Sequence, residues 1–167
     1  LLLWNHRWEH DKAPELFADA MIQLAGEGVP FRLALLGKRP RQVPPALARL
    51  REALPERIVA DGRLLPDEYR TLLGRAAIVV STARHEFQGL ALLEAASAGA
   101  RPLVPDALCY PEQYPPVCRY PEGDQQALVA RLRQWLTDDL PPAVDVSSWY
   151  SDQLAPVWAE VLAPPSN

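Results

Sequence analysis

Cysteine and lysine are scarce in this chain of 167 residues. The two cysteines, Cys109 and Cys118, are too few for a disulfide framework or a zinc site of four thiolates. Neither has a nearby basic partner, and we expect ordinary thiols. Lysine occurs only at Lys12 and Lys38, a bias of composition that says little about function.

Long apolar runs and strong net charge are also missing. The longest apolar runs, Leu1 to Trp4 and Ala76 to Val80, fall far short of the roughly 20 residues that cross a bilayer. No basic stretch precedes the apolar start, so no signal peptide is indicated. A formal charge of -4 offers no overall attraction to nucleic acid. We therefore expect a cytoplasmic protein with no membrane association.

The composition that is present predicts one globular domain. Hydrophobic residues make up 49% and charged residues 23% of the chain, which excludes intrinsic disorder. The length suits a single domain with a core of its own. Paired prolines, as at Pro44-Pro45 and Pro115-Pro116, mark loops. The chain starts at Leu1 inside a strand-like run, so we expect that a segment upstream has been removed.

Short apolar runs alternate with helical patterns along the whole chain. Leu1 to Trp4 is continuously apolar, as in a strand buried on both faces, and Pro14 then suits the first turn of a helix. We expect strands at residues 1–4, 31–36, 58–60, 77–81, 102–104 and 117–120, and helices at 14–26, 45–54, 66 onward, 89–98, 124–137 and 148–162, the last interrupted near Pro156. The alternation predicts an α/β fold: a Rossmann-like, doubly wound parallel sheet of about six strands with helices on both faces.

Ligands on such sheets bind at the carboxyl ends of the strands, beside helix N-termini. Three loops are therefore candidates for the site: residues 5–12, 37–41 and 81–89. In the first, Arg7 and Lys12 are five residues apart and would suit a diphosphate, because arginine grips two oxygens and lysine supplies a point charge. The alternative is a solvated loop with ion pairs to Glu9 or Asp11.

The same loop contains the pattern H-x-x-E-H, from His6 to His10, which occurs in inverted zinc peptidases. That chemistry needs both histidines on one helical face, with Glu9 as the base. An apolar strand before the pattern and Pro14 after it leave little room for such a helix. A zinc hydrolase is therefore a distant alternative.

Two glutamates mark the third loop and the helix after it. Glu86 follows the clearest strand, and Glu94 lies in the second turn of the next helix. Both can face one crevice, where carboxylates accept from sugar hydroxyls. Glu94 lies in a helix that is apolar nearly all round, so we expect it to be partly buried and partnered. Gly89 would let backbone N–H groups approach an anion, and Glu112, after the fifth strand, reaches the crevice or belongs to a plain turn.

Together these clusters resemble the donor-binding, C-terminal domain of the retaining group 1 (family 4) glycosyltransferases of GT-B fold. An Arg-x4-Lys pair follows the first strand of that domain, matched by Arg7 and Lys12, and an E-x7-E signature is matched by Glu86 and Glu94. The similarity runs from Leu1 to about Leu136. Residues 4–12, 81–86 and 110–112 are most similar to the tRNA-queuosine α-mannosyltransferases. The usual Glu-Gly-Phe-Gly is Glu86-Phe-Gln-Gly89 here, and the glycine pair that often precedes Pro-Glu is replaced by residues 106–110.

The resemblance implies a GDP-mannose donor and a queuosine nucleoside of tRNA as acceptor. It implies that Arg7 and Lys12 stabilise the leaving diphosphate, that Glu86 orients the sugar and that Glu94 accepts from the ribose. Catalytic roles would fall to Arg7, Lys12 and Glu86. No acidic pair suited to a metal is apparent, so retaining transfer without a metal or other cofactor is expected. The implied donor-binding set is Arg7, Lys12, Gly62, Leu64, Glu86, Phe87, Gln88, Gly89, Leu90 and Glu94.

In that family the acceptor domain precedes the donor domain. We therefore expect residues 1–167 to be the donor-binding domain alone, with the N-terminal acceptor domain absent and the isolated domain inactive in transfer. A basic surface for tRNA would then lie mainly on the missing half. A non-catalytic nucleotide-binding domain of the same fold remains an alternative.

Overall fold

The computed structural model describes residues 1–38 and 43–163. Six parallel strands form one sheet in the order β3-β2-β1-β4-β5-β6. The strands are β1 (Leu2–Trp4), β2 (Leu33–Leu36), β3 (Ile58–Gly62), β4 (Ile78–Val80), β5 (Arg101–Pro105) and β6 (Arg119–Tyr120). The predicted doubly wound α/β sheet is confirmed, with the order reversing at β1, between β2 and β4.

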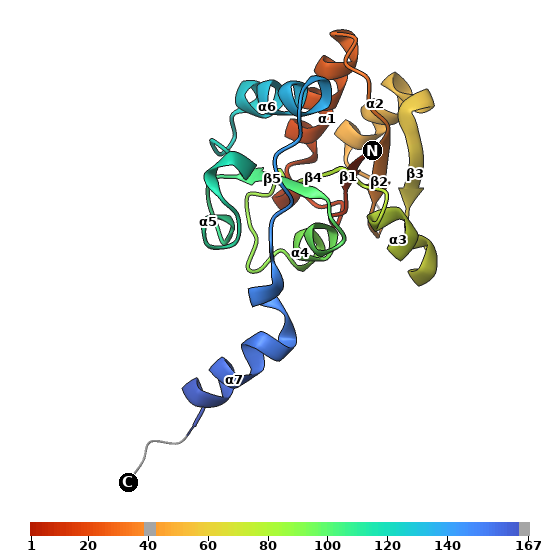
Figure 1. Ribbon diagram of the computed structural model, residues 1–167. Coiled ribbons are helices and arrows are strands. Elements are labelled where there is room, and N and C mark those ends of the chain that lie inside the picture. The colour runs from red at the N-terminus through yellow and green to blue at the C-terminus, as the bar shows by residue number, and fades with distance from the viewer. Residues whose placement is uncertain (39–42, 164–167) are drawn as a thin grey trace.

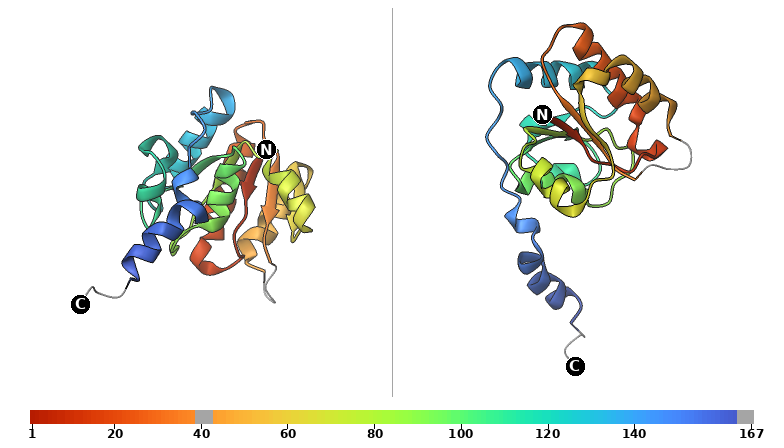
Figure 2. Two further views of the ribbon diagram at one scale, coloured as in Figure 1. Left: turned by 60° about the horizontal axis from the view of Figure 1, so that its bottom comes forward. Right: turned by 90° about the vertical axis from the view of Figure 1, so that its right-hand side faces the viewer.

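Helices cover both faces of the sheet (Figure 1). On one face α1 (Pro14–Gly26) packs between α2 (Pro45–Ala53) and α6 (Gln125–Thr137), while α3 (Pro66–Leu73) and α4 (Leu90–Ser97) lie on the other face (Figure 2). Proline occupies a first-turn position in α1, α2 and α3, where its missing N–H costs nothing. Short helices are η1 (His10–Lys12), η2 (Pro55–Arg57), α5 (Tyr110–Gln113), η3 (Pro116–Cys118) and η4 (Ser147–Trp149).

The core is built from the central strands and the inner faces of these helices. Every residue of β1, β2 and β4 is buried, as the continuous apolar runs predict for parallel strands. Trp4 stacks on Phe17 of α1 with ring centroids 5.3 Å apart, which ties the first strand to the first helix. No helix in the described ranges is long and apolar enough to cross a membrane.

Several predicted boundaries were wrong by two or three residues. The second strand begins at Leu33, which pairs with Leu2, although the Arg32 carbonyl already accepts from the Leu2 N–H at 2.8 Å, and the third strand continues to Gly62. Residues 117 and 118, expected to begin the sixth strand, belong instead to η3, since Pro116 begins a turn of 3-10 helix. Glu112 does not lie in a plain turn, because it is part of the short helix α5 that begins at Tyr110.

The last helix, α7 (Ser151–Val161), projects from the body of the domain (Figure 1). None of its residues is buried. The predicted interruption at Pro156 was wrong, because the helix continues through it. Proline removes one backbone hydrogen bond, and in an exposed helix the carbonyl that loses it can be hydrated.

Candidate active site

Three adjoining cavities lie along the carboxyl edge of β1 to β4. The Lys12 pocket, of about 550 Å³, is lined by residues 5–7, Lys12 and residues 86–91. The Gly62 pocket, of about 570 Å³, is lined by Asn5, residues 36–38, residues 62–64, Pro66 and Tyr69. The Glu94 pocket, of about 430 Å³, is lined by Pro66, Tyr69, Arg70, Leu73, Glu94, Ser97 and Ala98. Asn5 borders the first two cavities and Tyr69 the last two, so the three cavities are neighbours.

Lys12 is the buried cation of the first pocket, with a side chain only 7% exposed. Its ammonium Nζ lies 2.6 Å from the carbonyl oxygen of His85, 3.1 Å from Glu86 Oε2 and 3.2 Å from Asp11 Oδ2. Three acceptors match the three N–H donors of an ammonium. The backbone holds Lys12 in place, because its carbonyl accepts from the Thr82 hydroxyl at 2.7 Å.

Glu86 is the partner that sequence spacing could not assign to Lys12. Its side chain is 18% exposed and follows β4. Burial raises the pKa of Glu86, but the hydrogen bond and charge of Lys12, with the backbone N–H groups of Gly89 and Phe87, outweigh it and lower that pKa below its ordinary value. Glu86 is therefore held as a carboxylate at neutral pH, able to accept from a hydroxyl.

Arg7 is the exposed cation of the same pocket. Its side chain is 66% exposed, with nitrogen–oxygen distances of 3.3 Å to Glu9 and 4.0 Å to Asp11. Surface ion pairs of this kind contribute little to stability. Arg7 therefore has the surface ion pairs that the solvated-loop alternative expected. Arg7 and Lys12 nevertheless line the same cavity.

His6 is buried behind this pair, edge-on to Trp4 with ring centroids 5.4 Å apart. Burial, followed by the charge of Lys12, lowers the pKa of His6 to about 4, against the opposing effects of Glu86, the Val80 carbonyl and Asp11. The imidazole is therefore neutral at neutral pH. The H-x-x-E-H pattern does not lie on one helix, as the sequence predicted. Residues 6–9 form no helix, and His10 is a largely exposed member of η1. Within the described ranges, no three His, Cys, Asp or Glu side chains are grouped to hold a metal ion.

Gly89 opens α4 toward the Lys12 pocket. Its φ of +68° is in the left-handed region, and a Cβ there would lie 3.2 Å from the Tyr110 ring. The N-cap residue has no side chain to cap the helix, and residues 88–91, at its N-terminal end, line the cavity. Phe87 beside them is fully exposed.

The short helix α5 supports this turn, and the sequence did not reveal it. Gln113 is buried and donates from Nε2 to the Gln88 carbonyl at 2.7 Å, and Tyr110 shares a 2.8 Å hydrogen bond with Ser81. Glu112, proposed from sequence as a candidate for the crevice, is exposed on α5. A helix of four residues carries no periodic signal that sequence analysis could use.

The Gly62 pocket contains two residues of the implied donor-binding set, Gly62 and Leu64. Gly37 also lines this pocket, with φ at +150°. A Cβ on Gly37 would lie 2.1 Å from the His6 carbonyl oxygen, so only glycine lets the two strand ends approach this closely.

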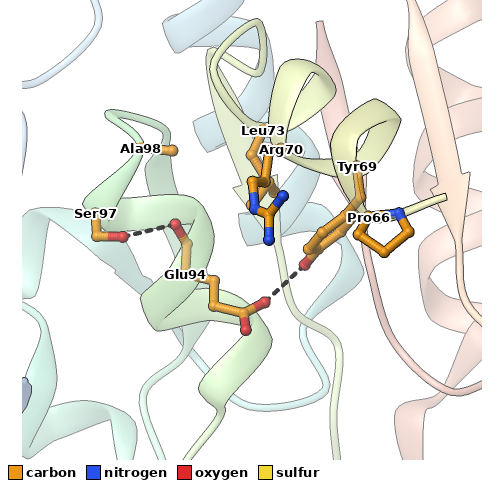
Figure 3. A pocket seen from close by; sticks show the side chains of 7 residues that line it. All are labelled: Pro66, Tyr69, Arg70, Leu73, Glu94, Ser97 and Ala98. Carbon is orange, nitrogen blue, oxygen red and sulfur yellow. Dashed lines mark hydrogen bonds between the residues drawn. The ribbon is translucent and has the colours of Figure 1, made fainter. Parts of the chain in front are cut away.

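Glu94 lies in the third cavity, where Figure 3 shows its carboxylate pointing toward Tyr69 of α3. The Tyr69 hydroxyl donates to Glu94 Oε2 at 2.9 Å. The expected partial burial of Glu94 was wrong, since Leu92, Leu93, Ala95 and Ala96 turn inward and leave Glu94 on the exposed stripe with Leu90 and Ser97. The expected partner exists, and nothing in the sequence pointed to Tyr69.

The fold and the placement of this site define a GT-B type Rossmann-like domain. Residues 1–138 match the family model of the group 1 glycosyl transferases, so the chain belongs to that family. This agrees with the similarity expected from Leu1 to about Leu136.

Curated and solved proteins agree with this family. The chain is 43% identical over 114 residues to the tRNA-queuosine alpha-mannosyltransferase of Drosophila melanogaster, an alignment that covers 68% of this chain and 30% of that protein. Anabaena HepE, solved in complex with UDP, has a TM-score of 0.75 at 17% identity over 96% of this chain and 48% of its own. The catalytic domain of Helicobacter pylori cholesterol-alpha-glucosyltransferase has a TM-score of 0.64 at 18% identity, covering 81% and 86%. At these identities the structures support the fold alone.

Proposed function

We propose that this chain is the donor-binding domain of a retaining mannosyltransferase that takes mannose from GDP-mannose to queuosine in tRNA. The observation that carries the donor site is the Lys12 pocket, where a buried ammonium, an exposed guanidinium and an uncapped helix N-terminus meet a carboxylate. Donors for an anion and an acceptor for hydroxyls in one cavity suit a sugar diphosphate. The identity to the Drosophila enzyme supports mannose and queuosine.

In this proposal the two cations have different tasks. The N–H groups of Lys12 already have three acceptors, so Lys12 contributes a fixed positive charge near the diphosphate. Arg7 exchanges weak surface partners for phosphate oxygens, which costs little. As the bond from the sugar C1 to the phosphate oxygen breaks, both charges stabilise the leaving diphosphate. Glu86 accepts from sugar hydroxyls and orients C1 for attack on the face that the diphosphate leaves.

The remaining cavities would hold the nucleoside. Glu94 accepts from the ribose hydroxyls, and the loop at Gly62 and Leu64 surrounds the base. The chain spans 30% of the Drosophila relative, and we propose that the rest of such a protein supplies the acceptor site and the tRNA contacts. This chain alone should then bind nucleotide and transfer sugar poorly or not at all.

Thermal unfolding with GDP, UDP or ADP tests the donor. A ligand at about 100 times its Kd adds ~2.7 kcal/mol, a rise in Tm of roughly 5–10 °C for a domain of this size. We expect a rise with GDP and a smaller one with UDP or ADP. A larger rise with UDP would mean that the site prefers uracil to guanine as the base of its donor. No rise with any of the three nucleotides would contradict the donor site.

A further inference from the structure

Tyr69 lines two of the three cavities, the Gly62 pocket and the Glu94 pocket, and has no role in the site as described so far. Its hydroxyl accepts from Asn5 Nδ2 at 3.2 Å and donates to Glu94 Oε2 at 2.9 Å (Figure 3 shows the second bond). Asn5 also donates to the Ala91 carbonyl, at 2.9 Å. The phenol of Tyr69 thus connects its own helix α3 to Asn5, just after β1, and to Glu94 of α4. These two residues are 64 and 25 residues away from Tyr69 in the sequence.

The direction of each bond in this chain is fixed by chemistry. An amide nitrogen only donates, so the Tyr69 oxygen must accept from Asn5 and its single proton must go to the carboxylate. Both N–H bonds of the Asn5 amide are used, one on Tyr69 and one on Ala91. Burial, with the Glu94 carboxylate opposing and Asn5 favouring ionisation, raises the pKa of Tyr69 to about 12, so the proton stays on the phenol.

The hydrogen bond from Tyr69 fixes the orientation of the Glu94 carboxylate. An exposed glutamate on a helix ordinarily samples many rotamers, and fixing it on a ligand costs entropy. Tyr69 donates to Oε2, and within the described residues no hydrogen bond reaches Oε1, which belongs to the lining of the Glu94 pocket next to the Gly62 pocket that Tyr69 also lines. The carboxylate is therefore held before any ligand arrives.

We propose that Tyr69 is a positioning residue that presents Glu94 to the ribose of the nucleoside diphosphate. The inference rests on the proposed function, in which Glu94 accepts from ribose hydroxyls. Through Asn5, which directly precedes His6 and Arg7, the same phenol links the ribose carboxylate to the loop that carries the diphosphate cations.

The test combines removal of the Tyr69 hydroxyl from the protein with removal of the two ribose hydroxyls from the ligand. Tyr69→Phe keeps the ring, and 2′,3′-dideoxy-GDP and 2′,3′-dideoxy-UDP keep the base and diphosphate; Kd is measured by calorimetry for both proteins with GDP, UDP and these analogues. We expect Tyr69→Phe to weaken the favoured ribonucleotide roughly three- to tenfold, as loss of one hydrogen bond implies. It should change the affinity for the dideoxy form less than twofold. Inorganic pyrophosphate should bind both proteins equally.

Each other result has a definite meaning. Equal weakening of ribo and dideoxy forms would assign Tyr69 to the fold of the cavity and overturn the inference, and so would no weakening of either. A wild-type chain that binds neither GDP nor UDP would overturn the proposed function itself. Tyr120→Phe is the matched control, because it removes a buried tyrosine hydroxyl that donates to the Ser81 carbonyl at 2.9 Å, and it should leave all Kd values unchanged.

Discussion

The two carboxylates of the site are held in opposite ways. Glu86 lies beside a buried ammonium at 3.1 Å, with backbone N–H groups on its other side. Glu94 lies on an exposed helix face and is held by a neutral phenol at 2.9 Å. The first arrangement is a largely buried ion pair, and the second is a hydrogen bond at the surface.

This difference separates stability from binding within one site. Removing one member of a buried pair leaves an uncompensated charge, whereas removing an exposed hydrogen bond leaves a group that water can reach. Substitutions on the Lys12 side should therefore change both unfolding and binding. Those on the Glu94 side, and at exposed Arg7, should change binding alone.

Lys12→Ala should have the largest effect. It leaves Glu86 and Asp11 without their ammonium, and we expect a loss of about 3–5 kcal/mol in the free energy of unfolding, measured by urea denaturation, together with loss of GDP binding. Lys12→Met combined with Glu86→Gln should recover much of the stability but not the binding. Lys38→Ala, at the other lysine, should cost less than about 0.5 kcal/mol, and an equal cost at both lysines would contradict the buried-pair interpretation.

Acid should weaken the Lys12 side through His6. The folded protein keeps His6 neutral down to a pKa of about 4, whereas the unfolded chain takes up that proton near 6.5, so stability is full above 6.5 and falls toward pH 4. The loss is on the order of 3 kcal/mol over this window, about 2 of it above pH 5. Unfolding measured at pH 7 and pH 5 should show the difference in the wild type and in His10→Gln. His6→Phe should be much flatter, and an unchanged slope there would assign the loss to other groups.

Arg7→Ala should weaken GDP binding without changing the stability of the fold. Loss of a charge-assisted hydrogen bond should weaken GDP by about 1.5–3 kcal/mol in calorimetry. The urea midpoint should barely move, since the partners of Arg7 are surface carboxylates. Arg49→Ala, which loses a comparable surface pair with Asp19, should leave both quantities unchanged. Unchanged GDP affinity in Arg7→Ala would refute the diphosphate assignment.

Glu94→Gln should have the smallest effect, because the amide keeps an acceptor oxygen and loses only the charge. We expect about 1 kcal/mol weaker binding of GDP, no change for pyrophosphate and no change in Tm. A large fall in Tm would mean that Glu94 supports the fold as Glu86 does, and the contrast between the two carboxylates would disappear.

Much of the fold could be predicted because its signals are local. Continuous apolar runs predicted the buried strands, and proline at first turns predicted the helix starts. The helix α5 escaped prediction because four residues are too few for periodicity. The start of the second strand shifted to Leu33 because pairing, not hydrophobicity, sets where a ladder begins.

Several residues of the site could be predicted from the sequence, but their pairing could not. Arg7, Lys12, Glu86 and Gly89 could be proposed because parallel strands bring their carboxyl ends to one edge, so the loops after them must meet. Which residue would pair with which could not be predicted. Lys12 and Glu86 are 74 residues apart, and the partner of Glu94 comes from another helix.

By itself the sequence determined the order of strands and helices and the chemical groups in the loops at the carboxyl edge, because hydrophobic pattern and turn residues act over a few neighbours. Only the tertiary structure decided that Lys12 is buried on Glu86, that Arg7 is exposed with surface carboxylates as its partners and that Tyr69 holds Glu94. Burial and partnership depend on the packing of segments distant in sequence, and that packing sets which charge stabilises the fold and which remains available for a ligand.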